Sequence, residues 1–170
     1  RNKRRIEGKI MKLAVLGPGC WGLTITKLLN NNFDEICVWG RKEDITPTLQ
    51  NEKRLDFPLK IQLDKKVEIT TDLKYALKDA VIILLVVATG GIRPVCEQIK
   101  KIGLDKNQIL VNLSKGIELP SLKRMSEVIS EVLPDIKLAV LSGPTLAREI
   151  VEGHPTLATI ASKDENVAKE

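Results

Sequence analysis

The chain has 170 residues, of which 43% are hydrophobic and 29% are charged, the balance of an ordinary globular domain. This composition excludes a disordered or fibrous protein, and the longest apolar run, residues 80–88, is too short to span a bilayer. Residues 1–10 carry five basic side chains and one acid, and so hold +4 of the formal net charge of +5. The remaining chain is almost neutral and has few aromatic residues, which argues against a nucleic-acid surface. We interpret residues 1–10 as a basic N-terminal extension, with nucleic-acid binding as a minor alternative.

The cysteines and the single histidine limit the metal and redox chemistry that the chain can perform. Cys20, Cys37 and Cys96 are odd in number and show neither a CxxC nor a Cys/His spacing. This pattern is typical of a protein of the reducing cytoplasm rather than of a disulfide scaffold or a zinc site. We therefore expect a cytoplasmic location and no metal site.

Short apolar runs predict strands, and apolar residues spaced three or four apart predict the helices between them. The predicted strands are residues 12–17, 35–40, 67–70, 81–87, 108–113, 137–141 and 156–161. Helices are predicted from Trp21 to Leu29, Leu73 to Ala80, Ile92 to Ile102, Leu122 to Leu133 and Thr145 to Val151. Residues 41–65 are expected to form a variable helix and loop, and a further helix begins towards Glu170.

This alternation of strands and helices predicts an α/β fold. The strand at residues 81–87 is apolar throughout, as strands are when both faces of a parallel sheet are covered. Asp72 stands where its carboxylate can cap the helix that follows. We expect a doubly wound, mostly parallel sheet of the Rossmann type, with residues 11–170 forming one dinucleotide-binding domain.

The strongest motif is a G-x-G-x-x-G pattern, Gly17-Pro18-Gly19-Cys20-Trp21-Gly22, which follows the first strand and opens a helix. Gly17 allows a tight turn, Gly19 lets the backbone approach a pyrophosphate, and Gly22 lets the helix pack close to the strand. The free N–H groups of the helix N-terminus suit phosphate oxygens. The weaker alternative is a plain glycine-rich turn. We interpret Cys20 as a small residue tolerated beside the phosphates, rather than as a reactive thiol.

The end of the second predicted strand distinguishes between the two nicotinamide cofactors. An acid there would bind the ribose 2′-OH of NAD, whereas this chain reads Trp39-Gly40-Arg41-Lys42. Two basic side chains suit the 2′-phosphate of NADP, which a guanidinium can hold through two hydrogen bonds. We therefore predict NADP, with NAD as the alternative because Glu43 follows closely. The competing interpretation is that Arg41 and Lys42 are solvated loop charges.

Further candidate residues follow the later strands, because ligands of open α/β sheets bind beyond the carboxyl ends of the strands. Thr89-Gly90-Gly91 follows the fourth predicted strand, Ser114-Lys115-Gly116 the fifth, and Ser142-Gly143-Pro144-Thr145 the sixth. Lys115 could polarise a substrate carbonyl and stabilise negative charge on its oxygen. Residues 143–145 are expected to begin a helix and to offer N–H groups and a hydroxyl to a ligand. The competing interpretations are a surface lysine and a simple helix cap.

These segments together resemble the NAD(P)-dependent glycerol-3-phosphate dehydrogenases of the bacterial type. The resemblance begins at KLAVLGPGCWG, continues through VWGR and SKGIE, and is most specific at AVLSGPTLAREI, which Gly153-x-Pro155-Thr156 follows. The motifs run in order over residues 11–161, which is nearly the whole chain. The chain departs from the family pattern in two places. Cys20 replaces the usual serine, and Ala88-Thr89 replaces a frequent Pro-Ser.

The resemblance implies the reversible reduction of dihydroxyacetone phosphate to sn-glycerol 3-phosphate with NAD(P)H, for phospholipid synthesis in the cytoplasm. It implies cofactor contacts at Cys20, Trp21, Arg41, Lys42, Lys115 and Ala147, and substrate contacts at Lys115, Gly143 and Thr145. Family members carry a second, helical domain with another catalytic lysine. We therefore expect residues 11–170 to be the cofactor domain alone, with the helical C-terminal substrate domain absent and any homodimer formed through that domain. Such a chain should bind cofactor and turn over little or no substrate.

Two alternatives remain open at this level. The chain could be the cofactor domain of another NAD(P)-dependent dehydrogenase, because a fold does not settle a substrate. It could also be a non-catalytic nucleotide-binding module that senses redox state. The substitution Lys115→Ala distinguishes these classes, because an enzyme should lose activity by orders of magnitude while a sensor should keep its ligand response.

Overall fold

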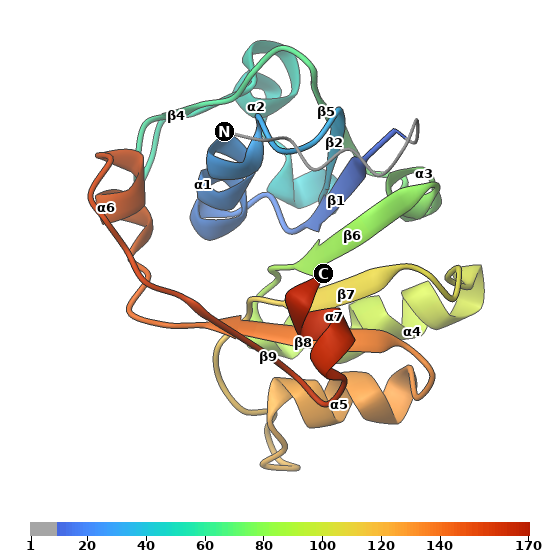
Figure 1. The fold of residues 1–170 in the computed structure, drawn as a ribbon. Helices are drawn as coiled ribbons and strands as arrows, with labels where there is room; N and C mark the ends of the chain where they lie inside the picture. Colours follow the sequence, from blue (N-terminus) through green and yellow to red (C-terminus); the bar gives the residue numbers. More distant parts are fainter. Residues whose placement is uncertain (1–9) are drawn as a thin grey trace.

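A seven-stranded sheet forms the centre of the structure, a computed structural model that describes residues 10–170 (Figure 1). The basic extension predicted for residues 1–10 thus lies, except for Ile10, outside the described residues. The strand order is β5-β2-β1-β6-β7-β8-β9, and only β9 pairs antiparallel to its neighbour in this sheet. The strands are β1 (Lys12–Leu16), β2 (Glu35–Trp39), β5 (Val67–Thr70), β6 (Ala80–Leu85), β7 (Ile109–Asn112), β8 (Lys137–Ser142) and β9 (Thr159–Ser162). The predicted doubly wound, mostly parallel sheet is confirmed.

Helices cover both faces of the sheet (Figure 1). One face packs against α1 (Cys20–Leu29), α2 (Pro47–Glu52) and α7 (Glu165–Lys169), and the other against α3 (Leu73–Leu77), α4 (Ile92–Ile102) and α5 (Met125–Val132). Side chains alternate along β1, so that Leu13 and Val15 join the first core and Ala14 and Leu16 the second. All four side chains are fully buried, two on each face of the sheet. Residues 13–16 of β1 are therefore apolar without interruption.

Local interactions account for several element boundaries. The Asp72 carboxylate accepts a 3.0 Å hydrogen bond from the Tyr75 N–H, so the predicted cap of α3 is confirmed. Gly103 ends α4 with a φ of 81°. The short α6 (Ala147–Val151) lies against α1. Within residues 10–170, none of the helices has the length and apolar character needed to cross a membrane.

Two sequence expectations about helix starts are wrong. Leu122 was expected in a helical stripe, yet it has a φ of 57° and is exposed, and α5 begins only at Met125. The Glu127 carboxylate caps that start by accepting a 2.8 Å hydrogen bond from the Arg124 N–H. Residues 143–145 were expected to begin a helix, but α6 begins at Ala147. They are held instead by packing between the β8 end and the loop before β9, which is described below.

The segment 41–65 contains more structure than the expected helix and loop. A 3₁₀ turn, η1 (Lys42–Asp44), precedes α2, and a two-stranded hairpin follows it, β3 (Arg54–Leu55) with β4 (Ile61–Gln62). Leu49 and Ile61 are buried in the same core as α1, which anchors the segment over that face of the sheet. The sequence does not predict this hairpin, because each of its strands has only two residues. That is too short for an alternation of apolar and polar residues to be recognised.

Candidate functional site

The candidate site lies at the carboxyl ends of β1 and β6, where the chain winds in opposite directions across the sheet. The chain passes from β1 outward to β2 and from β6 outward to β7, so their connections leave a crevice between them. Gly17 follows β1 with a φ of 124°, and a Cβ atom there would lie 2.7 Å from the Val86 carbonyl oxygen. Only glycine can therefore bring these two strand ends so close.

The other two glycines of the motif meet different constraints. A Cβ atom on Gly22 would lie 2.0 Å from the Gly17 carbonyl oxygen, so glycine is required for the close approach of α1 to the turn. A Cβ atom on Gly19 would meet nothing within 4 Å, and Gly19 is the exposed N-cap residue of α1. The backbone at Gly19 thus faces open space at the positive end of a ten-residue helix, an arrangement that suits phosphate oxygens.

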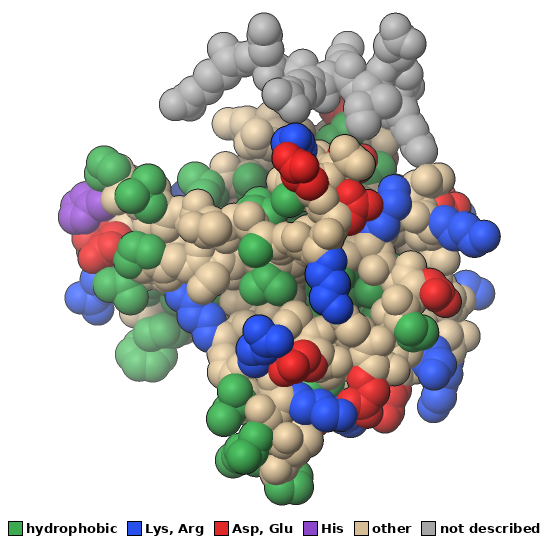
Figure 2. Space-filling view, turned by 60° about the horizontal axis from the view of Figure 1, so that its bottom comes forward, with side chains coloured by type: hydrophobic (Ala, Val, Ile, Leu, Met, Phe, Trp, Pro, Cys, Tyr) green, Lys and Arg blue, Asp and Glu red, His purple; other side chains and the backbone are tan. Residues whose placement is uncertain are grey.

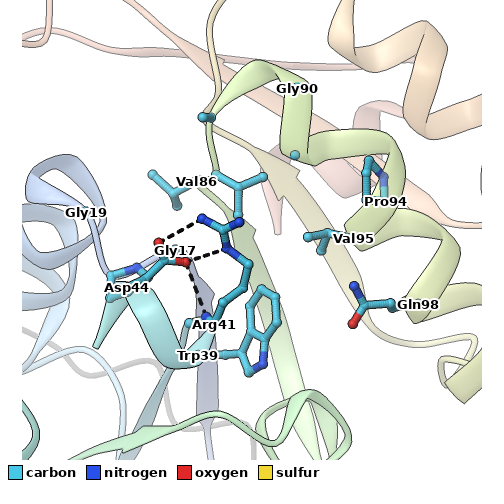
Figure 3. A pocket seen from close by; sticks show the side chains of 15 residues that line it. Gly17, Gly19, Trp39, Arg41, Asp44, Val86, Gly90, Pro94, Val95 and Gln98 are labelled. Carbon is cyan, nitrogen blue, oxygen red and sulfur yellow. Dashed lines mark hydrogen bonds and ion pairs between the residues drawn. The ribbon is translucent and has the colours of Figure 1, made fainter. Parts of the chain in front are cut away.

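A first cavity of about 550 Å³ opens beside this turn (Figure 3). Gly17 and Gly19 form one wall, and Arg41 and Asp44, which follow β2, form another. Pro94, Val95 and Gln98 of α4 lie across the cavity from them (Figure 3). A concave, partly apolar space with a few polar groups and a helix N-terminus at its edge can hold a nucleotide.

Arg41 does not lie free in this cavity. Its Nε and Nη2 donate hydrogen bonds of 2.8 Å and 2.9 Å to the two carboxylate oxygens of Asp44, and its Nη1 lies 3.2 Å from Glu43 Oε1. This pairing lowers the pKa of Asp44 and raises that of Arg41. Lys42 is exposed and lines neither this cavity nor the next.

A second cavity of about 360 Å³ lies on the other side of residues 86–88, which line both cavities. Trp21 of α1, Lys115 after β7, and Thr145 and Ala147 after β8 line it. Lys115 Nζ donates hydrogen bonds of 3.0 Å to the Gly143 carbonyl oxygen and 3.4 Å to Thr145 Oγ1. These bonds hold the ammonium group at the cavity wall and leave one of its three N–H donors for a ligand.

The backbone of Lys115 is fixed by two hydroxyl groups from neighbouring strand ends. Ser114 Oγ donates a 2.6 Å hydrogen bond to the Val87 carbonyl oxygen, and Thr89 Oγ1 donates one of 3.0 Å to the Lys115 carbonyl oxygen. Sequence reasoning placed the segments of Thr89 and Ser114 at the strand ends but gave neither hydroxyl a role. A hydroxyl residue within two positions of a strand-end glycine is the signal that could have found them.

An ion-pair network braces the loop that follows Lys115. Arg93 of α4 donates hydrogen bonds of 2.8 Å and 2.9 Å to the Glu118 carboxylate and one of 3.0 Å to Glu131. Ser121 Oγ donates a further 2.6 Å hydrogen bond to Glu118. Hydrogen bonding to Arg93 lowers the pKa of Glu118 to about 2. This network therefore joins α4, which lines the first cavity, to the loop that carries Lys115.

The structure places most of the predicted site residues at the two cavities. Gly17, Gly19 and Arg41 line the first, and Trp21, Lys115, Thr145 and Ala147 line the second; Cys20, Gly22, Lys42 and Gly143 line neither. Gly143 has a φ of 154° and a Cβ atom there would lie 2.6 Å from the Leu157 carbonyl oxygen, so packing already requires glycine. Burial raises the pKa of the Cys20 thiol, which disfavours the thiolate form.

Sequence reasoning missed Asp44 and Gln98, which also line the first cavity. Asp44 lies five residues after the end of β2, and only the η1 turn brings it back to the cavity. Gln98 belongs to α4, whose orientation across the sheet is a tertiary property. Among residues 10–170, no group of three or more His, Cys, Asp or Glu side chains could hold a metal ion.

The space-filling view shows acidic and basic side chains interspersed over one face (Figure 2). Hydrophobic side chains gather at the end of the molecule that carries the histidine (Figure 2). Near that histidine in the chain, Leu146 and Leu157 are exposed. Leu146 also lines the second cavity, so an exposed apolar side chain stands at the edge of the candidate site.

The family model and the curated relatives that match this chain all describe glycerol-3-phosphate dehydrogenases. The family model described as the N-terminus of NAD-dependent glycerol-3-phosphate dehydrogenase matches residues 12–168. A curated glycerol-3-phosphate dehydrogenase (NAD(P)+) of Thermoanaerobacter sp. (strain X514) is 42% identical over 156 residues, 89% of this chain and 46% of that protein. One of Bacillus subtilis (strain 168) is 36% identical over 94% of this chain and 47% of that protein. The chain thus spans about half the length of the curated relatives it matches.

A solved structure of the same kind of enzyme shares the fold of this chain. The crystal structure of glycerol-3-phosphate dehydrogenase from Coxiella burnetii superposes with a TM-score of 0.84 at 26% identity, over 94% of this chain and 49% of that chain. The resemblance read from the motifs is confirmed.

Proposed function

Because the chain belongs to the family of NAD-dependent glycerol-3-phosphate dehydrogenase N-termini, we propose that it holds the nicotinamide cofactor of such an enzyme. The reaction is the interconversion of dihydroxyacetone phosphate and sn-glycerol 3-phosphate with NADP(H) or NAD(H). One observation carries the proposal: two cavities meet at residues 86–88, with the glycine turn at the first and Lys115 at the second. A dinucleotide needs such a pair of compartments around a phosphate site.

The residues present fit a dinucleotide. The glycine turn and the α1 N-terminus would hold the pyrophosphate, the cavity of Arg41 and Gln98 the adenosine, and the cavity of Trp21 and Lys115 the nicotinamide. Trp21 Nε1 is buried with no hydrogen-bond partner among the described residues, an unpaired donor that a ligand at this wall could satisfy. Ala147 closes the same cavity.

Lys115 has the catalytic role in this proposal. When bound, the reduced nicotinamide supplies a hydride to the carbonyl carbon of the substrate. The Lys115 ammonium, held by Gly143 and Thr145, orients the ketone and stabilises negative charge on its oxygen. We assign the substrate contacts to Lys115, Gly143 and Thr145, and the Gly143 carbonyl oxygen also positions the Lys115 ammonium group.

The remaining cofactor contacts and the setting belong to the same proposal. We assign Cys20 and Gly22 to the phosphate turn and Lys42 to the outer rim of the adenosine site. We place the activity in the cytoplasm, where glycerol 3-phosphate serves phospholipid synthesis, and we assign dimer formation to the second half found in longer relatives. Residues 11–170 act as the cofactor domain.

Fluorescence titration of the 170-residue chain with NADH and NADPH tests the cofactor site. The tryptophans Trp21 and Trp39 line the second and first cavities, so both should report binding. Saturable quenching by either dinucleotide is the expected result. A folded chain, verified by circular dichroism, that responds to neither contradicts the proposal.

The role of Lys115 is tested in a chain that also carries a second half such as its relatives have. Lys115→Ala should lower kcat/KM for dihydroxyacetone phosphate by at least about 100-fold, the scale of losing one group that stabilises an oxyanion. The matched control is Lys106→Ala, an exposed lysine in the loop before β7. Equal activity of the two variants would remove Lys115 from the reaction.

A further inference from the structure

We propose that Asp44 sets the balance between NADP and NAD by holding the guanidinium that a 2′-phosphate would need. This inference rests on the proposed function and adds a specificity-determining residue to it. Asp44 and Arg41 line the same cavity, and Asp44 takes the edge of the guanidinium formed by Nε and Nη2. Figure 3 shows this pair beside the glycine turn.

Asp44 is held in place by more than its ion pair. Its Oδ2 atom also accepts a 3.3 Å hydrogen bond from the backbone N–H of Arg41, which caps the η1 turn. The carboxylate is therefore fixed at the start of the turn whether or not the arginine side chain stays with it. Its side chain is 34% exposed, against 64% for Glu43, so it is the more buried of the two acidic partners of Arg41.

The guanidinium edge that Asp44 occupies is the edge a phosphate would use. Two parallel N–H groups bind one carboxylate or one phosphate at a time, so a 2′-phosphate that uses the Nε and Nη2 edge has to displace Asp44 from Arg41. The displaced carboxylate would stay nearby through its backbone hydrogen bond and would repel the phosphate. A ribose 2′-OH meets neither cost and can donate a hydrogen bond to a carboxylate. Asp44 thus disfavours the binding of NADP and favours that of NAD, whereas the neighbouring Arg41 favours NADP.

The test compares the Kd values of NADPH and NADH for the 170-residue chain and its variants by titration calorimetry. Asp44→Asn removes the charge and keeps an oxygen for the backbone cap. It should lower the Kd of NADPH about tenfold and leave that of NADH within about threefold, as expected for releasing one charged hydrogen-bonded pair. Asp44→Ser, which can also cap the turn, should act in the same direction and guards against a folding defect.

Glu43→Gln is the matched control, because it removes the same charge from a neighbour that contacts only Nη1 and does not line the cavity. It should change the NADPH to NADH ratio by less than about threefold. In an Arg41→Ala background, the NADPH gain from Asp44→Asn should be smaller than in the unsubstituted chain, because no guanidinium is released and only the repulsion between Asp44 and the phosphate is relieved.

The outcomes separate this inference from the proposed function. An unchanged ratio in Asp44→Asn and Asp44→Ser, with NADH still bound, overturns the role of Asp44 and leaves the cofactor site intact. An equal shift in Glu43→Gln also overturns it, because the effect would then be one of net charge. If the folded, unsubstituted chain binds neither NADH nor NADPH, both the proposed function and this inference are overturned.

Discussion

Thr89 Oγ1 donates a 3.0 Å hydrogen bond to the carbonyl oxygen of Lys115, and this bond joins the loops that follow β6 and β7. The two residues are 26 positions apart in the chain. A Cβ atom on Gly116 would lie 2.9 Å from the same hydroxyl oxygen, so the loops are also in close contact. The lysine at the second cavity is thus positioned through its backbone by a neighbouring strand end.

Replacing Thr89 by valine should loosen the loop that carries Lys115. The valine keeps the shape of the side chain but lacks the hydroxyl donor, and one such bond contributes about 1 kcal/mol to the free energy of unfolding. We expect faster amide hydrogen exchange over residues 114–117, measured by mass spectrometry. Thr89→Ser keeps the donor and should exchange at the rate of the unsubstituted chain. Equal rates in both variants would show that the hydrogen bond does not order the loop.

Gly17→Ala should destabilise the fold through its close approach to β6. The new methyl group would lie 2.7 Å from the Val86 carbonyl oxygen, at a φ of 124°. We expect the free energy of unfolding, measured in urea, to fall by at least about 2 kcal/mol. Gly103→Ala separates strain from collision, since its φ is 81° but its Cβ atom meets nothing within 4 Å. That variant should lose about 1–3 kcal/mol from backbone strain alone and therefore less than Gly17→Ala, and equal losses would remove the collision from the explanation.

Gly19→Ala should weaken the binding of NADH without lowering the free energy of unfolding. The backbone at Gly19 has a φ of −70°, which alanine adopts readily, and its Cβ atom meets nothing within 4 Å. The free energy of unfolding should stay within about 0.5 kcal/mol of the original. The affinity for NADH should fall at least about tenfold, because the methyl group occupies the path by which a pyrophosphate approaches the α1 N-terminus. Unchanged affinity would place the phosphates elsewhere.

The Arg93–Glu118 pair should make stability depend on pH in the acid range. Hydrogen bonding to Arg93 lowers the pKa of Glu118 from its ordinary 4.5 to about 2. A carboxyl group whose pKa is lowered by folding stabilises the protein above its unfolded pKa, and this contribution is lost as the pH falls towards the folded value. Glu118→Gln should therefore lower Tm at pH 7, and the difference from the unsubstituted chain should close as the pH approaches 2.

The control for this prediction is Glu165→Gln, which breaks the pair of Glu165 with Lys169. Those side chains are 79% and 70% exposed, against 17% and 30% for Glu118 and Arg93. An exposed pair contributes little to stability, so Tm should hardly change at either pH. A Tm difference for Glu118→Gln that is the same at pH 7 and near pH 2 would contradict the assigned role of the Arg93 contact.

The sequence by itself determined the order of the strands and helices that form the central sheet and its two covering layers, the fold class and the family. These follow from local patterns: uninterrupted apolar strands such as β6, and a glycine motif placed between a strand and a helix. It also singled out Lys115 and Arg41 as strand-end cations, because parallel strands bring their carboxyl ends to one edge. Local patterns sufficed here because each depends only on residues adjacent in the chain.

The tertiary structure alone decided which partners these residues have. The guanidinium of Arg41 is held by Asp44, the ammonium of Lys115 by Gly143 and Thr145, and Leu122 lies outside the helix expected for it. Each outcome depends on how a loop folds locally or on how separate loops meet in space. The contacts of Lys115 join residues 28 and 30 positions apart and are chosen by packing and hydrogen-bond geometry, whereas the Arg41–Asp44 pair depends on the conformation of the η1 turn. No periodicity in the sequence records either.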